Sequence, residues 1–137
     1  MDREILFRGK RVDNNQWTEG FLSFIYTDGR NSNGFIYTDK AQIYSPVEVR
    51  SHDVYTSTVG QFTGLCDDKE RKVFEGDIVD VRGRFKSEVR YVCRNTGYLI
   101  KDNYGNWEWL YDVLASMHCE IIGNIYDNPE LAKEESE

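Results

Sequence analysis

The sequence is poor in cysteine, histidine and proline, and each scarcity narrows the chemistry that the chain can perform. Its three cysteines, Cys66, Cys93 and Cys119, are odd in number, widely spaced and without a C-x-x-C pair. This pattern argues against a disulfide framework or a zinc site, so we predict free, reduced thiols. The two prolines and eleven glycines are spread along the chain, which excludes a collagen-like or low-complexity protein.

Long apolar segments are lacking as well. No apolar run approaches the ~18 residues of a membrane span. The first nine residues, MDREILFRG, contain no signal-peptide core. We therefore expect a cytoplasmic protein without membrane contact. At 137 residues the chain is long enough for one domain, or for two small modules that share a core.

The acidic charge is concentrated at the end of the chain. The formal net charge is −7, and residues 127–137 carry one lysine against five carboxylates. These charged residues are Asp127, Glu130, Lys133, Glu134, Glu135 and Glu137. A short acidic end is usually solvated, and it can also steer a basic partner. Because the rest of the chain is only mildly acidic, net charge does not exclude nucleic acid as a ligand.

Short β-prone runs separated by turn residues dominate the chain. WTEGFLSFIYT and IYSPVEV, for example, follow the turn-forming stretches DNNQ and DKAQ. This spacing predicts a mainly β fold, with a β meander over residues 1–57 and an SH3-like β-barrel over 58–128 on which the meander packs. Asn128 before Pro129 is typical of a helix start, so residues 129–137 are predicted as a short helix and acidic tail.

The clearest periodic signal follows Gly76. Residues 78–94 alternate between apolar and charged side chains, as expected for a strand with one buried face. A reversal near residues 83–87 makes the segment a predicted hairpin. By parity, its basic side chains share one face: Arg82, Arg84, Lys86, Arg90 and Arg94. This face is a candidate nucleic-acid or acidic-partner surface. The alternative is a solvated face whose cations pair with Asp80 and Glu88.

The stretch VGQFTGLCDDKERKVFEGDIVDV, residues 59–81, combines glycines with acidic residues. We predict that it turns the chain into a barrel strand, with Gly60, Gly64 and Gly76 as structural turn residues. The rival hypothesis is a cation site made by Asp67, Asp68, Glu75 and Asp77. Their spacing does not match a calcium loop. The neighbouring basic residues Lys69, Arg71 and Lys72 would also oppose a cation, so no metal is expected.

No catalytic arrangement is evident in the sequence. His118 and Cys119 are adjacent, so on a strand their side chains face opposite sides and cannot form a nucleophile–base pair. Pairing in space of Cys93 with His52, or of Cys66 with His118, stays open. We expect no enzymatic activity and no cofactor. A hidden hydrolase or nuclease is the third hypothesis for function.

Trp107 and Trp109 are two residues apart, which places both indoles on the same face of a predicted strand. Two tryptophans on one face usually belong to a core. If that face is open, they would form an anchor for a protein partner or for a second copy of the chain.

Three segments carry a resemblance to a known family. TVGQFTGLCDDKERKVFEGDIV (residues 58–79), IIGNIYDNPEL (121–131) and REILFRGKRVDNNQWTEGFL (3–22) resemble the YopX family of phage and prophage proteins. Members often have glycine in the turn that here reads Asp68-Lys69-Glu70-Arg71. The resemblance implies a largely β, phage-encoded protein in the host cytoplasm. It implies no catalytic residues.

These observations rank the functional hypotheses. The first is a non-catalytic interaction module that binds a host or phage protein, or a second copy of itself. The alternative is a nucleic-acid-binding module that uses the basic face of residues 82–94.

Overall fold

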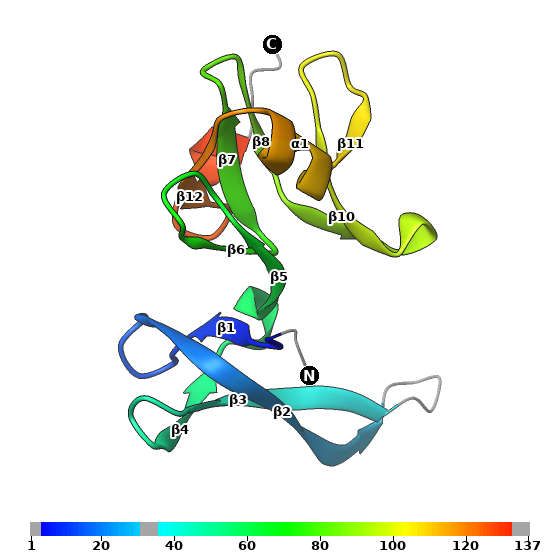
Figure 1. Ribbon diagram of the computed structural model, residues 1–137. Coiled ribbons are helices and arrows are strands. Elements are labelled where there is room, and N and C mark those ends of the chain that lie inside the picture. The colour runs from blue at the N-terminus through cyan, green and yellow to red at the C-terminus, as the bar shows by residue number, and fades with distance from the viewer. Residues whose placement is uncertain (1–3, 31–35, 133–137) are drawn as a thin grey trace. The chain divides into compact units, whose positions relative to one another are not determined.

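The computed structural model describes residues 4–30 and 36–132, and it divides into two compact units, residues 1–61 and 62–137. Both units are built mainly from β-strands (Figure 1). The mainly β class predicted from the sequence is therefore confirmed. Lys133, Glu134, Glu135 and Glu137 of the acidic tail lie outside the described residues.

The first unit is an antiparallel sheet. Its elements are β1 (Phe7–Lys10), β2 (Trp17–Arg30), β3 (Ile36–Ser45), β4 (Arg50–Val54), the 3-10 turn η1 (Thr56–Thr58) and the start of β5 (Gly60–Cys66). The strand order is β4-β3-β2-β1, and Gly60 and Gln61 of β5 pair with β1. Buried Ala41, Ile43 and Val54 form its core.

The second unit contains two three-stranded antiparallel sheets and two short helices. Its elements are the rest of β5, β6 (Lys72–Phe74), β7 (Asp77–Val81), β8 (Phe85–Glu88), β9 (Arg90–Val92), the 3-10 turn η2 (Cys93–Asn95), β10 (Gly97–Lys101), β11 (Trp107–Trp109), α1 (Leu110–Ser116), β12 (Cys119–Asn124) and α2 (Pro129–Ala132). The sheet orders are β12-β7-β8 and β11-β10-β9. A closed barrel is not seen in this part of the described chain, so the SH3-like barrel is not confirmed.

The core of the second unit draws on both sheets and on α1. Its buried members are Val73, Val79, Val81, Val89, Ile100, Leu110, Val113 and Cys119. Leu110 directly follows β11 and begins α1. It is buried together with Val113 three residues later, because residues at this spacing share one face of a helix. The short helix predicted after Asn128 is present as α2.

The hairpin predicted after Gly76 is present as β7 and β8, but residues 82–94 as a whole belong to two different sheets. β8 ends at Glu88 and pairs with β7, whereas β9 begins at Arg90 and pairs with β10. Val89, between them, is fully buried, and its N–H donates to the carbonyl of Asp77. The alternation of apolar and charged residues therefore continues through Val89, although the chain passes there from one sheet to the other.

Two of the three glycines expected to act in turns have a positive φ. Gly64 has φ +89 and lies where β5 bulges in its pairing with β6. Gly76 has φ +93 in the turn between β6 and β7. Gly60 is different, because it lies in β5 and pairs with Arg8. In the part of the chain that the structure describes, no helix is long and apolar enough to span a membrane.

Candidate functional site

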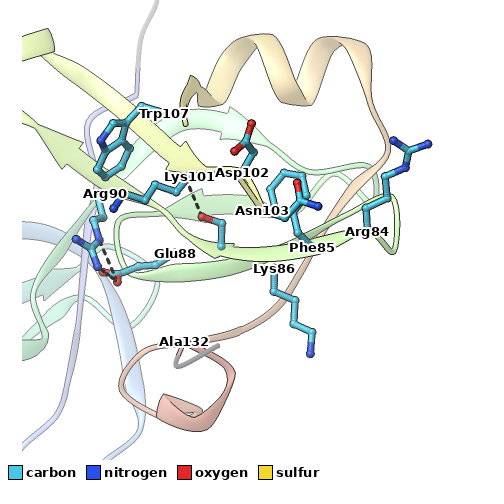
Figure 2. A pocket seen from close by; sticks show the side chains of 11 residues that line it. Arg84, Phe85, Lys86, Glu88, Arg90, Lys101, Asp102, Asn103, Trp107 and Ala132 are labelled. Atoms are coloured by element: carbon cyan, nitrogen blue, oxygen red, sulfur yellow. Dashed lines mark hydrogen bonds and ion pairs between the residues drawn. The ribbon is translucent and has the colours of Figure 1, made fainter. Parts of the chain in front are cut away.

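A cleft of about 570 Å³ opens in the second unit (Figure 2). Its walls come from β8, from the ends of β10 and β11 with the turn between them, and from the start of β9. The lining residues are Arg84, Phe85, Lys86, Ser87, Glu88, Arg90, Lys101, Asp102, Asn103, Trp107 and Ala132. The volume lies within the range of small-ligand pockets, roughly 300–1,000 Å³.

A tight turn positions the basic side chains at one end of the cleft. Arg82 and Gly83 have φ of +57 and +71, and the N–H of Arg84 donates to the carbonyl of Val81 at 2.9 Å. The carboxylate of Asp80 accepts a hydrogen bond from the N–H of Gly83 at 3.0 Å. Two central residues with positive φ suit the twist of a hairpin. The turn thus brings Arg84 to the start of β8, and Lys86 follows two residues later.

A second hairpin builds the opposite wall. Lys101 pairs directly with Trp107 at the end of the β10–β11 ladder. The carboxylate of Asp102 accepts hydrogen bonds from the N–H groups of Tyr104 and Asn106, each at 2.9 Å. The hydrogen bond from the N–H of Asn106, the largest influence, holds the pKa of Asp102 below its ordinary value. Asp102 therefore stays ionised while it organises the turn.

One hydrogen bond joins the two walls. The N–H of Lys101 donates to the hydroxyl of Ser87 at 2.9 Å, which links β10 to β8 (Figure 2). Because β8 and β10 belong to different sheets, this contact fixes the separation of the two walls at that point. The cleft is thus part of the folded framework of the second unit.

The cleft has an excess of positive charge. Four basic side chains and two carboxylates line it. The guanidinium of Arg90 and the carboxylate of Glu88 form an ion pair at 3.2 Å. Asp102 is engaged by backbone N–H groups, as described above. At the other end, the side chains of Arg84 and Lys86 form no ion pair or hydrogen bond with residues 4–24 and 40–132, whose side chains the structure describes.

The two tryptophans of β11 have different environments. Trp107 lines the cleft and is 43% exposed, and the ammonium of Lys101 lies 5.1 Å from the centre of its ring. Trp109 is half-buried against Gly97, where an added Cβ would lie only 2.6 Å from its Cζ3 atom. Trp107 is therefore available to a ligand, whereas Trp109 packs on the sheet.

In the structure, only some of the five basic residues proposed from the sequence line the cleft. Arg84, Lys86 and Arg90 line the cleft. Arg82 lies in the β7–β8 turn and Arg94 in η2, and neither lines it. The sequence prediction missed Lys101. The turn residues that follow it would have paired it with Trp107 across a hairpin, which is the signal that could have identified it.

Acidic residues of the rival cation-site hypothesis have structural partners. The buried carboxylate of Asp67 accepts hydrogen bonds from the N–H groups of Lys69, Arg71 and Ile121, and it pairs with the Arg71 guanidinium at 2.9 Å. The carboxylate of Asp77 accepts a hydrogen bond from the N–H of Phe74. Within residues 4–30 and 36–132, no group of three potential metal ligands is found.

Both histidines lie against carboxylates. Nε2 of His52 is 3.0 Å from the carboxylate of Glu48, and Nδ1 of His118 is 2.8 Å from that of Asp68. The carboxylate of Asp68 also accepts a hydrogen bond from the N–H of Cys119 at 3.2 Å. This second contact fixes Asp68 at the start of β12.

The three cysteines are expected to differ sharply in reactivity. Burial, assisted by the nearby carboxylates of Asp68, Asp67 and Asp80, raises the pKa of the Cys119 thiol to about 12. Cys66 and Cys93 are exposed. Because the thiolate is the reactive species, iodoacetamide at mildly alkaline pH should label two cysteines in the native protein and the third only after unfolding. Rapid labelling of Cys119 in the native state, read by peptide mass spectrometry, would contradict this expectation.

The sequence matches the YopX protein family model over residues 6–133, which is nearly the whole chain. The chain belongs to the YopX family. In the Asp68–Arg71 turn, this YopX protein has Glu70 with φ +62, a left-handed conformation that favours glycine. The carboxylate of Asp67 binds the N–H groups on both sides of Glu70, which stabilises the turn without glycine.

A solved structure has a similar fold. The crystal structure of protein EF1440 from Enterococcus faecalis matches with a TM-score of 0.50 and 24% sequence identity, covering 96% of this chain and 100% of that chain. At this identity the likeness concerns the fold of the YopX protein and not its activity. No curated protein matches the sequence.

Proposed function

We propose that this YopX protein is a non-catalytic interaction module and that the cleft of its second unit binds nucleic acid. The observation that carries the proposal is that four basic residues, Arg84, Lys86, Arg90 and Lys101, line a cleft that also exposes Trp107. The family resemblance adds a setting, which is a phage- or prophage-encoded protein acting in the host cytoplasm.

Phosphate is the ligand chemistry that best suits this charge distribution. Lysine and arginine that neutralise phosphates release condensed counterions, and this release supplies much of the affinity for nucleic acid. Arg84 and Lys86 are the cations best placed to bind a phosphate, because neither side chain must first give up a contact with a carboxylate or an aromatic ring of the described chain. Arg90 must exchange its contact with Glu88 for a phosphate, so it is expected to contribute less.

Salt dependence tests the proposal directly. Fluorescence anisotropy with a labelled oligothymidylate should detect binding at about 50 mM salt and a marked loss of affinity by about 200 mM. With four cations engaged, the slope of log affinity against log salt should approach about −3 for a single strand. Absence of binding at the lowest salt, or binding that does not change with salt, would contradict the proposal.

A protein partner is the second candidate, and exposed apolar side chains of the first unit favour it. Phe21 and Tyr44 are direct partners in the β2–β3 ladder and are 55% and 38% exposed. Val47 and Val49, in the turn that follows β3, are 90% and 70% exposed. Exposed apolar residues on neighbouring positions are typical of protein-binding surfaces. This surface lies in a different unit from Trp107 and Trp109, the aromatic pair proposed from the sequence.

Affinity capture from infected host cells, with and without nuclease, separates the two candidates. A protein that survives nuclease treatment, and that a Phe21→Ser, Tyr44→Ser variant no longer captures, would support the second candidate. Partners that disappear with nuclease would support the nucleic-acid proposal. Retention of the same protein by the variant would exclude the first-unit surface.

A further inference from the structure

We infer that the cleft binds single-stranded nucleic acid, with an unpaired base stacked on the indole of Trp107. This inference rests on the proposed function and specifies the ligand and the contact that selects it. In a duplex, the faces of the bases are covered by neighbouring bases, so an indole can stack only on a base that has left the helix. An exposed tryptophan beside cations is the combination used for single strands, since every base has an aromatic face and every nucleotide a phosphate.

The sheet places cations beside the indole. Lys101 is the direct partner of Trp107, and Leu99 pairs with Trp109 on one side and with Arg90 on the other. Because alternate residues of a strand share a face, Arg90 and Lys101 lie on the same side of the β9-β10-β11 sheet as Trp107. A base on the indole would therefore have its own phosphate within reach of these two cations.

The free protein already has a cation on the indole. The ammonium of Lys101 lies 5.1 Å from the ring centre, within the range of a cation–π contact. A planar base placed on the same face would displace this ammonium toward the phosphate. One substitution can therefore separate the two parts of the interaction, because Lys101→Met removes the charge and retains an extended side chain.

Two other aromatic residues near Trp107, Trp109 in β11 and Tyr104 in the β10–β11 turn, differ from it in their surroundings. Trp109 cannot offer the same surface, because its ring packs on Gly97 and lies 6.1 Å from that of Tyr111. Tyr104 is 84% exposed in the β10–β11 turn but does not line the cleft. If exposure alone were sufficient for base stacking, Tyr104 would contribute as much as Trp107.

The test compares two oligonucleotides of equal length and equal phosphate number, an oligothymidylate and its abasic analogue. Wild-type protein should bind the oligothymidylate roughly tenfold or more tightly, as expected for one stacked base. Trp107→Ala should reduce this affinity to that for the abasic strand, and Tyr104→Ala should leave both affinities unchanged. Lys101→Met should reduce the salt dependence of the affinity for both strands. The preference for the oligothymidylate over the abasic strand should remain.

Each outcome bears on a separate claim. Equal binding of the two strands by wild-type protein would overturn the stacking inference and leave nucleic-acid binding intact. Failure of both strands to bind at low salt would overturn the proposed function as well. Tighter binding of duplex than of oligothymidylate would also contradict the inference. The wild-type comparison needs no variant, so it stays decisive even if Trp107→Ala does not fold.

Discussion

Replacing Asp67 by alanine is expected to lower the free energy of unfolding by about 3 kcal/mol. The Asp67 side chain has no exposed surface. Its carboxylate accepts backbone hydrogen bonds from Lys69, Arg71 and Ile121 and two from the Arg71 guanidinium. Alanine would leave several donors without this acceptor and would remove the hydrogen bond from the Ile121 N–H, which is one of the contacts that join the Asp67–Arg71 turn to β12.

Urea denaturation of the variant, followed by fluorescence, measures this loss. Asp68→Ala is the matched control, since the Asp68 side chain is 32% exposed and has fewer partners near the same turn. The control should lose about 1 kcal/mol. Equal stability losses in the two variants would show that the Asp67 hydrogen-bond network does not have the structural role assigned to it.

The same network predicts a pH dependence. Burial opposes ionisation of Asp67, but hydrogen bonds from the Ile121 and Arg71 N–H groups and the Arg71 guanidinium outweigh it, so the pKa of Asp67 lies below its ordinary value of 3.8. A carboxylate of this kind contributes its full stabilisation above that ordinary pKa. The contribution is lost as the pH falls through the lower, folded-state pKa. The stability difference between wild type and Asp67→Ala should therefore shrink only below about pH 4.

Replacing Gly76 by valine should destabilise the protein by about 3 kcal/mol. Gly76 has φ +93, which a β-branched residue adopts only with strain. An added Cβ would lie 3.1 Å from Cε2 of Tyr126. The backbone cannot rotate away easily, because the Gly76 N–H donates to the carbonyl of Val89 and the Gly76 carbonyl accepts from the N–H of Ile125, each at 3.0 Å.

Thermal unfolding should show this loss as a fall in Tm of roughly 10 °C. Gly64→Val is the control, because Gly64 has a similar φ of +89 but no atom within 4 Å of an added Cβ. The control measures backbone strain alone, and the excess at Gly76 measures the contact with Tyr126. A Gly76→Val protein that kept the wild-type Tm would contradict the structural role of this turn.

The sequence predicted those parts of the fold that depend on local chemistry. Asn128 and Pro129 indicated the start of α2, and the glycines between Val59 and Val81 indicated turns because two of them need a positive φ. The change of sheet at Val89 was not predictable from alternation. An apolar residue such as Val89 is expected to be buried whether the strand continues through it or ends there. Contacts with distant segments determine which of the two occurs, and the local sequence does not show them.

The candidate site was predictable only in part for the same reason. Parity grouped Arg84, Lys86 and Arg90, and all three line the cleft, although β8 and β9 belong to different sheets. It also included Arg82 and Arg94, whose positions depend on the conformation of a turn and of η2. The turn after Lys101 could have placed it beside Trp107, but the hydrogen bond from its N–H to Ser87, 14 residues away, brings that hairpin to β8 and follows from no local pattern.

The most direct test of the cleft as a nucleic-acid site is a comparison of two double charge reversals. Arg84→Glu with Lys86→Glu alters the cleft, and Arg82→Glu with Arg94→Glu makes the same change in net charge outside it. Affinity for oligothymidylate at about 50 mM salt should fall about tenfold or more in the first variant and change much less in the second. Equal losses in the two variants, or no loss in the first, would contradict the proposed site.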